Sequence, residues 1–193
     1  MKILFLGYTD SSLIDFLRND GNEVVATSDE ISDAWLIENN FDLLISYGYR
    51  YIISSSELQA VDYAAINLHI SFLPFNRGAD PNFWSFVEDS PKGVTIHLID
   101  EGLDTGNIIC QKEVELNDSM TLRESYAILQ SAIIQLFRTN WSEWKTALPK
   151  GHKANGVGSY HNSADKNSLV DGIDNWLDIP IRELKGRMER RAN

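Results

Sequence analysis

The first fifty residues alternate between short apolar runs and helical segments, and this alternation constrains the fold more than any other feature of the chain. The apolar runs are Lys2–Tyr8, Glu23–Ser28 and Asp42–Tyr47. Unbroken runs of this length are typical of strands buried on both faces. Leu13–Asn19 and Ile31–Glu38, which lie between them, have helical periodicity. Strands that alternate with helices form a parallel sheet covered by helices, so the chain is predicted to be an α/β protein.

Three further strands are predicted downstream, at Ala64–His69, Gly93–Asp100 and Ile108–Leu116, where apolar and β-branched residues gather. The segment Ser71–Pro81 contains two prolines and a glycine and is predicted to be a loop. Gly102–Gly106 is predicted to be a tight connection. Each of these loops follows a strand. The expected fold is an open, mostly parallel, doubly wound sheet.

A long amphipathic helix is predicted to begin at a capping box, Thr121–Glu124. Apolar side chains then recur every three or four residues, and we interpret this stripe as core rather than as a cofactor site. The stripe consists of Leu122, Tyr126, Leu129, Ile133, Phe137 and Trp141. Residues 149–168 lack periodicity, whereas Ile181–Arg191 is predicted to be helical. We therefore expect a main domain, residues 1–148, and a short C-terminal extension, residues 149–193, packed on or near it.

The bulk composition narrows the classes of partner. A formal net charge of −11 opposes broad capture of nucleic acid, because non-specific affinity comes from basic groups that displace counterions. Cys110 is the only cysteine, which excludes an internal disulfide and fits a reducing compartment. The first apolar run is too short for a signal peptide, and no segment approaches the roughly 20 apolar residues of a membrane span. We expect a cytoplasmic protein that binds small molecules, with no nucleic-acid or membrane partner, and leave a homodimer open.

Polar side chains at the end of one predicted strand are candidates for chemistry. Asn67 and His69 are two residues apart, so strand geometry places both on the same side. Ligands of open α/β sheets bind beyond the carboxyl ends of the strands, where this pair lies. Taken alone, such a pair is more often hydrogen-bonded structure than a site. Asp104 taken alone is typical of a turn residue whose carboxylate bonds its own backbone.

Other polar groups are interpreted as structural or left open. His97 lies in a predicted strand, where an inward, hydrogen-bonded histidine is the more ordinary interpretation, and Asp100 is either a second carboxylate or a turn cap. Both are metal-ligand types, as are His69 and Asp104, but the spacing matches no zinc signature and we expect no metal. The loop Gly7–Ser12 lacks the glycine pattern that lets backbone approach a pyrophosphate, so no dinucleotide is expected either.

Taken together, two segments resemble the folate-dependent formyltransferases, a family that includes glycinamide ribonucleotide, methionyl-tRNA and nucleotide-sugar formyltransferases. Ile66–Gly78 contains Asn-X-His-X-Ser-X-Leu-Pro and an Arg-Gly pair, and Gly93–Gly106 combines Gly-Val-Thr-Ile-His with Leu-Asp-X-Gly. Family-like character extends over residues 1–140. The resemblance implies a Rossmann-like formyltransferase core and 10-formyltetrahydrofolate as the formyl donor. It also implies a catalytic trio, which consists of Asn67, His69 and Asp104.

By the same resemblance, the pterin ring of the donor lies mainly against the backbone of two loops. One follows the third strand and the other surrounds the catalytic aspartate. The residues that match these loops are Arg50, Tyr51 and Ile52 in the first, and Ile99, Asp100, Gly102 and Leu103 in the second.

The implied reaction explains why such residue types are needed. An amine attacks the formyl carbon, and a tetrahedral oxyanion develops that the amide N–H of Asn67 can stabilise. His69 donates a hydrogen bond when protonated or removes a proton from the amine when neutral. A neighbouring Asp104 carboxylate favours the charged form of His69, orients it and relays protons through water.

The sequence lacks features of two acceptor classes, and this narrows the choice of acceptor amine. Glycinamide ribonucleotide enzymes carry a phosphate loop after the first strand, whereas this chain has Tyr8–Asp10, whose carboxylate would repel a phosphate. Methionyl-tRNA enzymes add a C-terminal barrel that the residues after the long helix are too few to supply. Arg77–Trp84 and Gly158–His161 most resemble formyltransferases that act on amino sugars linked to nucleotides.

We therefore predict that the acceptor is a nucleotide-linked amino deoxysugar and that Arg77, Gly78 and Trp84 contact it. Arg77 either pairs with a phosphate or anchors its own loop. For Trp84, packing in the core or at an interface is favoured over stacking on a base. Two other classes stay open: a 10-formyltetrahydrofolate hydrolase, in which water replaces the amine, and a binding protein without turnover.

Overall fold

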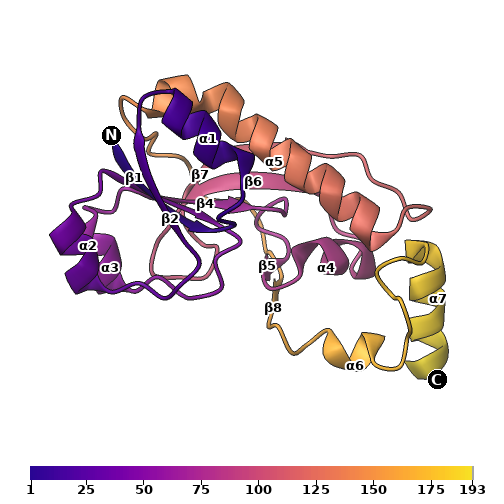
Figure 1. Cartoon of the computed structure of the whole chain (residues 1–193). Helices are drawn as coiled ribbons and strands as arrows, with labels where there is room; N and C mark the ends of the chain where they lie inside the picture. Colours follow the sequence, from indigo (N-terminus) through magenta and orange to yellow (C-terminus); the bar gives the residue numbers. More distant parts are fainter. Residues whose placement is uncertain (193) are drawn as a thin grey trace.

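The protein, described here by a computed structural model over residues 1–192, is built on one six-stranded sheet (Figure 1). Its strands are β1 (Lys2–Gly7), β2 (Glu23–Thr27), β3 (Leu43–Tyr47), β4 (Ala65–His69), β6 (Gly93–Leu98) and β7 (Ile108–Glu113). They lie in the order β2-β1-β3-β4-β6-β7. The first four are parallel, while β6 and β7 each run antiparallel to the preceding strand in the sheet. The predicted α/β class is confirmed, with a mixed sheet.

Helices cover both faces of this sheet. Figure 1 shows α1 (Ser12–Asn19) and α5 (Leu122–Trp144) on one face, with α2 (Asp33–Asn39) and α3 (Ser55–Ala60) on the other. Successive residues of β1 point to opposite faces, so Ile3 and Phe5 join the core under α1 and α5, while Leu4 and Leu6 join the core under α2 and α3. Burial on both faces explains why the parallel strands read as unbroken apolar runs.

Several short elements depart from the sequence prediction. The predicted loop 71–81 contains β5 (Arg77–Gly78) and the first residue of α4 (Pro81–Val87), and the predicted irregular segment 149–168 contains β8 (Tyr160–His161) and the start of α6 (Asn167–Val170). β5 and β8 form a separate two-stranded parallel sheet. Two-residue strands leave no periodic pattern, because their pairing depends on residues about eighty positions away in the sequence.

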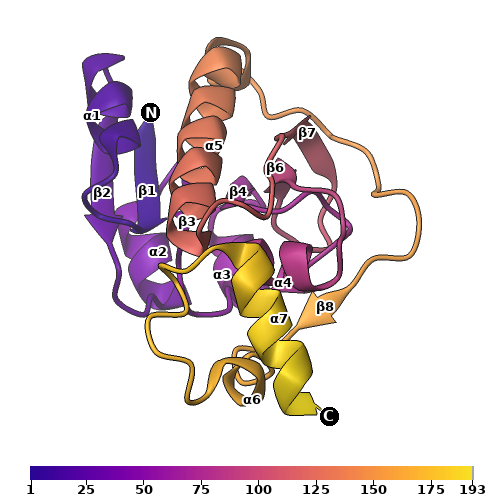
Figure 2. The same ribbon diagram turned by 90° about the vertical axis from the view of Figure 1, so that its right-hand side faces the viewer.

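The segment after α5 packs against α4 and the start of α5. Figure 2 shows α7 (Ile181–Ala192) at this end of the molecule, near α4. Phe83 and Phe86 of α4 share a buried cluster with Val170, Ile181 and Leu184 of the C-terminal segment. The assignment of residues 1–148 and 149–193 to a domain and an extension stays a prediction. No helix within residues 1–192 is long and apolar enough to cross a membrane.

Candidate active site

The carboxyl end of β4 brings Asn67 and His69 together with Asp104. Asn67 Nδ2 donates a hydrogen bond to Asp104 Oδ1 at 3.1 Å, and His69 Nδ1 lies 3.7 Å from Asp104 Oδ2. The two β4 residues thus contact different oxygens of one carboxylate, which requires their side chains to lie on the same side of the strand. The side chains of His69 and Asp104 are only 8% and 9% exposed, so water screens their interaction weakly.

Asp104 is held by backbone from another segment rather than by its own turn. Its φ of 53° lies in the left-handed region, which short polar residues tolerate better than others. Gly78 N donates to Asp104 Oδ2 at 2.8 Å. The turn is closed instead by Asp100, whose Oδ1 accepts from Gly102 N at 3.1 Å and from Thr105 Oγ1 at 2.6 Å. Asp100 is therefore the carboxylate that accepts hydrogen bonds from its own turn, and the Asp104 carboxylate faces the end of β4.

His97 of β6 belongs to the same cluster. It pairs with Asn67 across the antiparallel β4–β6 ladder, and its Nε2 lies 3.3 Å from Asn67 Nδ2 and 3.4 Å from Asp104 Oδ1. Its Nδ1 lies 2.8 Å from Leu98 O and carries a hydrogen, because a carbonyl can only accept. His97 is thus buried and hydrogen-bonded, as the sequence suggests, but its partners are two members of the predicted catalytic trio.

Burial and neighbouring groups set the protonation of the trio. Burial alone raises the pKa of Asp104, but His69, His97 and the Gly78 N–H together outweigh it and hold that pKa below its usual value. For His69, burial is the largest effect and lowers the pKa, although Asp104 acts in the opposite direction. At neutral pH the pair therefore consists of a carboxylate and a neutral imidazole. Asp104 raises the pKa of His69, as the sequence analysis predicts, but burial lowers that pKa by more.

The neutral His69 ring lies between two hydrogen-bond acceptors. Its Nε2 is 3.3 Å from Asn76 O, and its Nδ1 faces Asp104. A neutral imidazole carries one hydrogen and can satisfy one of these acceptors, whereas an imidazolium would satisfy both. The arrangement suits a base that is neutral before reaction and whose protonated form is hydrogen-bonded on both nitrogens.

A cavity of about 600 Å³ opens beside the trio. All the residues predicted to hold the folate line it: Arg50, Tyr51, Ile52, Ile99, Asp100, Gly102 and Leu103. The first three follow β3 and the others follow β6, so the two loops form walls of one cavity. Ile52 is 79% exposed and Tyr51 and Leu103 are about 40% exposed, which leaves apolar surface for a flat ring system.

The predicted acceptor residues are not brought together at the cavity. Gly78 lines it, but Arg77 and Trp84 are not among the lining residues. Arg77 Nε lies 3.5 Å from Ser159 O, a contact that anchors its loop. Trp84 is 7% exposed and stacks on His161, with ring centroids 3.8 Å apart and planes 5° from parallel. These positions favour the structural alternatives for both side chains.

Several tyrosines that the sequence analysis did not assign to a site line the cavity, among them Tyr8, Tyr47 and Tyr126. Tyr8 OH lies 2.5 Å from Tyr126 OH, and the Tyr8 ring meets the Tyr47 ring edge-on with centroids 4.9 Å apart. Tyr47 OH is buried without a hydrogen-bond partner in the described part of the chain. The interpretation of Tyr126 as core is wrong, because it is 37% exposed. The sequence does hold a signal that Tyr8 and Tyr47 belong to a binding site, because both lie at the carboxyl ends of parallel strands.

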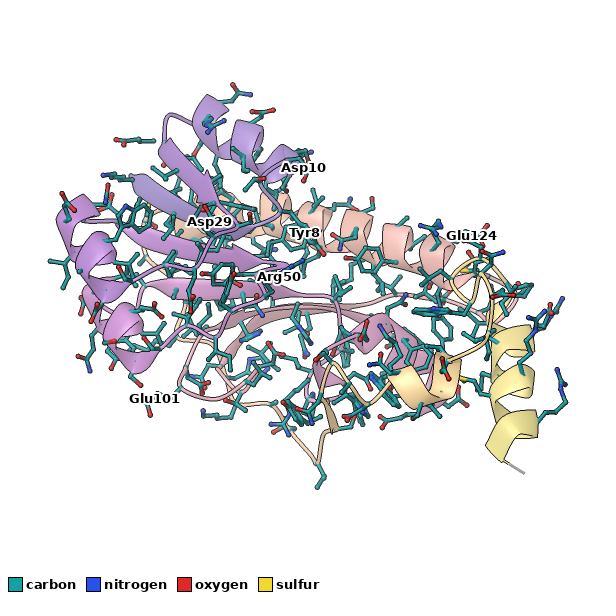
Figure 3. All side chains as sticks on the ribbon, turned by 60° about the horizontal axis from the view of Figure 1, so that its bottom comes forward. Tyr8, Asp10, Asp29, Arg50, Glu101 and Glu124 are labelled. Atoms are coloured by element: carbon teal, nitrogen blue, oxygen red, sulfur yellow. The ribbon has the colours of Figure 1, made fainter. Side chains whose placement is uncertain are left out.

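Figure 3 shows Tyr8 and Arg50 over the carboxyl ends of β1 and β3, with Asp10 farther out at the start of α1. Both Tyr8 and Arg50 line the cavity, whereas Asp10 does not. Asp10 is therefore poorly placed to repel a ligand in the cavity. The phenol of Tyr8 stands there instead, and phenol hydroxyls can donate or accept hydrogen bonds.

Comparison with known proteins finds this chain similar to formyl transferases. A family model described as formyl transferase matches residues 17–137. The formyltransferase PseJ from Anoxybacillus kamchatkensis is 45% identical in sequence to this chain. Its crystal structure is a complex with UDP-4,6-dideoxy-4-formamido-L-AltNAc and tetrahydrofolate. It matches with a TM-score of 0.90 over 97% of this chain and 100% of that one.

More distant relatives share the fold or part of the sequence. A 4-N formyltransferase from Francisella tularensis is 23% identical and has the same fold, with a TM-score of 0.80 over 97% of this chain and 87% of that one. A methionyl-tRNA formyltransferase of Clostridium botulinum is 32% identical over 166 residues, which cover 78% of this chain and 53% of that protein. The chain spans about half the length, or less, of the methionyl-tRNA formyltransferases it matches.

Proposed function

This chain belongs to the formyl transferase family, and from that premise we propose that it moves a formyl group from 10-formyltetrahydrofolate to the amine of a nucleotide-linked amino deoxysugar. The transfer itself rests on the buried cluster of Asn67, His69 and Asp104 beside the cavity. The choice of acceptor rests on one observation, the 45% identity with a protein whose crystals hold a UDP-linked formamido sugar and tetrahydrofolate.

The chemistry assigns a separate task to each member of the trio. The amine attacks the formyl carbon while Asn67 Nδ2 donates to the oxygen that gains charge. Neutral His69 takes the proton that the amine loses, directly or through water. Asp104, already ionised, accepts from Asn67 and stabilises the imidazolium that forms. Tetrahydrofolate leaves when the oxyanion collapses and the bond between the formyl carbon and the donor nitrogen breaks; that nitrogen takes up the proton from the imidazolium, directly or through water, which returns His69 to its neutral form.

Two groups of residues that line the cavity suit two different ligands. The exposed apolar residues Tyr51, Ile52 and Leu103 offer a surface for the pterin. Tyr8 and Tyr126 offer hydroxyl groups that suit the polar atoms of a sugar. We propose that the acceptor lies against these tyrosines and the donor against the loops after β3 and β6. The trio, which lies on β4 and on the loop after β6, would then act where the two reactants meet.

The test is a screen of nucleotide-linked 3- and 4-amino deoxysugars with 10-formyltetrahydrofolate, read by the mass gain of one formyl group. We expect one of these compounds to be formylated, and the matching free amino sugar to react much more slowly, because binding of the nucleotide positions the amine. Equal rates on free and nucleotide-linked sugars would contradict the proposed acceptor.

Control reactions separate the competing activities. Donor incubated without any amine tests the hydrolase, which would release formate and tetrahydrofolate at an undiminished rate. Glycinamide ribonucleotide and charged initiator tRNA test the other acceptor classes, and we expect negligible rates with both. For tRNA, a net charge of −11 provides little attraction for a polyanion. A preference for either compound would overturn the choice of acceptor and leave formyl transfer intact.

Tyr126→Phe tests the proposed contact of the acceptor with the tyrosines. It removes the hydroxyl that contacts Tyr8 at 2.5 Å and keeps the ring. We expect the KM for the amino sugar to rise about tenfold while the KM for the donor stays within about twofold, since one hydrogen bond is lost on the acceptor side only. Equal effects on both KM values, measured by steady-state titration of each substrate, would contradict this placement.

A further inference from the structure

The two central residues of the site are both contacted by one short stretch of backbone outside β4 and the Asp104 loop. Asn76 O lies 3.3 Å from His69 Nε2, and Gly78 N donates to Asp104 Oδ2 at 2.8 Å. These groups are only two residues apart. The position of residues 76–78 therefore affects the geometry of His69 and Asp104 at the same time.

This stretch is held from its other side by the C-terminal segment. Arg77 N donates to Ser159 O and Ala79 N donates to His161 O, both at 3.0 Å, so β5 and β8 form a short parallel pair. Gly78 makes this approach possible, because a Cβ there would lie 2.4 Å from His161 O, and its φ of +86° disfavours a side chain as well. β8 thus lies directly behind the backbone that contacts the trio.

Ser159 forms the side-chain part of this brace. Its Oγ accepts from Asn76 N at 3.0 Å and donates to Glu88 Oε2 at 2.7 Å. It also lies 3.2 Å from Asn76 Oδ1, but its single hydrogen is better used by the nearer, charged carboxylate. Asn76 is fully buried, so removal of this oxygen would leave its N–H without a partner.

A second set of contacts fixes β8 on α4. His161 Nε2 lies 3.0 Å from Glu88 Oε1, and the imidazole stacks on the Trp84 indole at 3.8 Å. Glu88 thus accepts a hydrogen bond from Ser159 through one oxygen, while its other oxygen lies close to His161 Nε2 without hydrogen-bond geometry, so the stacking on Trp84 is the main contact of His161. Because α4 is anchored in the cluster it shares with the C-terminal helices, β8 has a rigid support.

We propose that β8 and the residue before it, Ser159, form a positioning element of the active site: Ser159 holds the Asn76 backbone against His69, and the β5–β8 pair holds Gly78 N on Asp104. Ser159 is a positioning residue, because none of its hydrogen bonds within residues 1–192 goes to the trio and it is not among the residues that line the cavity. The catalytic part of this inference rests on the proposed function. It gives the segment after Pro149 a role in turnover rather than only in packing.

The test compares Ser159→Ala with two variants of the same segment. Ser159→Thr restores the hydroxyl, and Val157→Ala changes a side chain that is 93% exposed. We expect kcat to fall about tenfold or more in Ser159→Ala, because small displacements of catalytic groups are costly. The donor KM should stay within about twofold, Ser159→Thr should recover most of kcat, and Val157→Ala should match the wild type.

A second readout needs no substrate. The titration of His69, followed by NMR and assigned with a His69→Gln variant, responds to Asn76 O, to Asp104 on the loop after β6 and to His97 on β6. Asn76 O favours the protonated ring, so its displacement in Ser159→Ala should move the midpoint of His69 to lower pH by about half a unit. The same shift should appear in the acidic limb of the rate profile.

The two readouts separate the two proposals. If no acceptor is formylated but the His69 midpoint moves in Ser159→Ala, the proposed function fails and the positioning stands. If the wild type is active while Ser159→Ala keeps both its kcat and its His69 midpoint, the positioning fails. When the wild type is active, a change in only one of the two readouts also overturns the positioning. Should Ser159→Ala not fold, Glu88→Gln weakens the same hydroxyl contact, and the same outcomes apply to it.

Discussion

Asn67 has one amide nitrogen and three groups that its hydrogens could reach. Asp104 Oδ1 and His97 Nε2 lie 3.1 and 3.3 Å from it, and the oxyanion of the proposed reaction would be the third. Asp104 is held below its usual pKa and stays charged, so its hydrogen bond orients the amide. The second hydrogen can then turn from His97 to the oxyanion as charge develops.

We therefore expect Asn67→Ala to lower kcat by at least about 10²-fold, the effect typical of losing an oxyanion donor. His69→Ala should have an effect of similar size through loss of the base. Donor affinity should remain within about tenfold, because both groups act mainly as charge develops. Steady-state rates and donor titrations check this. Asn155→Ala, at an exposed position away from the cavity lining, is the control, and near-normal turnover in either trio variant would refute the assignment.

Asp104→Asn should change the pH dependence as well as the rate. Asp104 favours protonated His69, so removing its charge lowers the pKa of His69 further. Because the proposed base is the neutral ring, activity is lost as the pH falls through that pKa. The acidic limb of kcat/KM should therefore move to lower pH in the variant. An unchanged limb together with full activity would reduce Asp104 to a structural turn residue.

The trio was predicted from the resemblance of two motifs to a known family, and local rules account for only part of its geometry. Strand period places Asn67 and His69 on one side, and the Leu-Asp-X-Gly motif marks Asp104. Their supports could not be predicted in the same way. Asn76 O and Gly78 N act through the backbone, which every residue possesses, so no side-chain pattern marks them.

At the scale of elements, the same contrast holds. The sheet strands leave apolar, β-branched runs and α5 leaves a helical period, so the positions of these elements could be predicted to within a few residues. α4 and the β5–β8 pair depend on contacts between distant segments, such as the buried bonds from Asn82 Nδ2 to Leu122 O and Ser125 Oγ. α3 is different, since its capping box from Ser54 to Glu57 is visible in the sequence and was overlooked.

The helices α1 and α5 are joined by Asp20, which follows the end of α1. Its carboxylate accepts from Trp141 Nε1 at 2.8 Å and lies 3.2 Å from Lys145 Nζ. The hydrogen bond from Trp141, followed by that from Lys145, lowers the pKa of Asp20 from its usual value. Since the folded-state pKa lies below the unfolded one, the charged form stabilises the fold above the unfolded pKa of 3.8, and this contribution disappears as the pH falls through the folded-state value.

Asp20→Asn should therefore destabilise the protein at pH 7, and the difference from the wild type should shrink below about pH 4. Denaturant unfolding at a series of pH values measures it. Asp15→Asn is the matched control, because Asp15 lies on α1 but its side chain is 82% exposed and 3.9 Å from Arg18. If the difference in unfolding free energy between the two proteins stayed constant across the pH series, the contribution of Asp20 would come from packing rather than from its charge.

At the scale of the whole molecule, the cavity joins parts of the fold that are otherwise distinct. Tyr8 follows the first strand, Arg50 follows the third, Asp104 lies in the antiparallel half, and Tyr160 belongs to the C-terminal segment, yet all four line it. A ligand in this cavity would contact each part and favour the state in which all are packed. The fold class follows from the first fifty residues alone, but this convergence depends on the complete arrangement.

Tetrahydrofolate should consequently stabilise the folded protein without any acceptor present. At about 100 times its dissociation constant, a ligand that binds only the folded state adds about 2.7 kcal/mol, which raises the Tm by roughly 5–10 °C for a chain of this size. Thermal unfolding with and without the ligand measures the shift. Asn67→Ala should keep it, because Asn67 is proposed to act on the transition state, whereas Ile52→Asp should lose most of it by placing a charge on the exposed apolar wall. An equal shift in Ile52→Asp would mean that the folate binds outside the loops after β3 and β6.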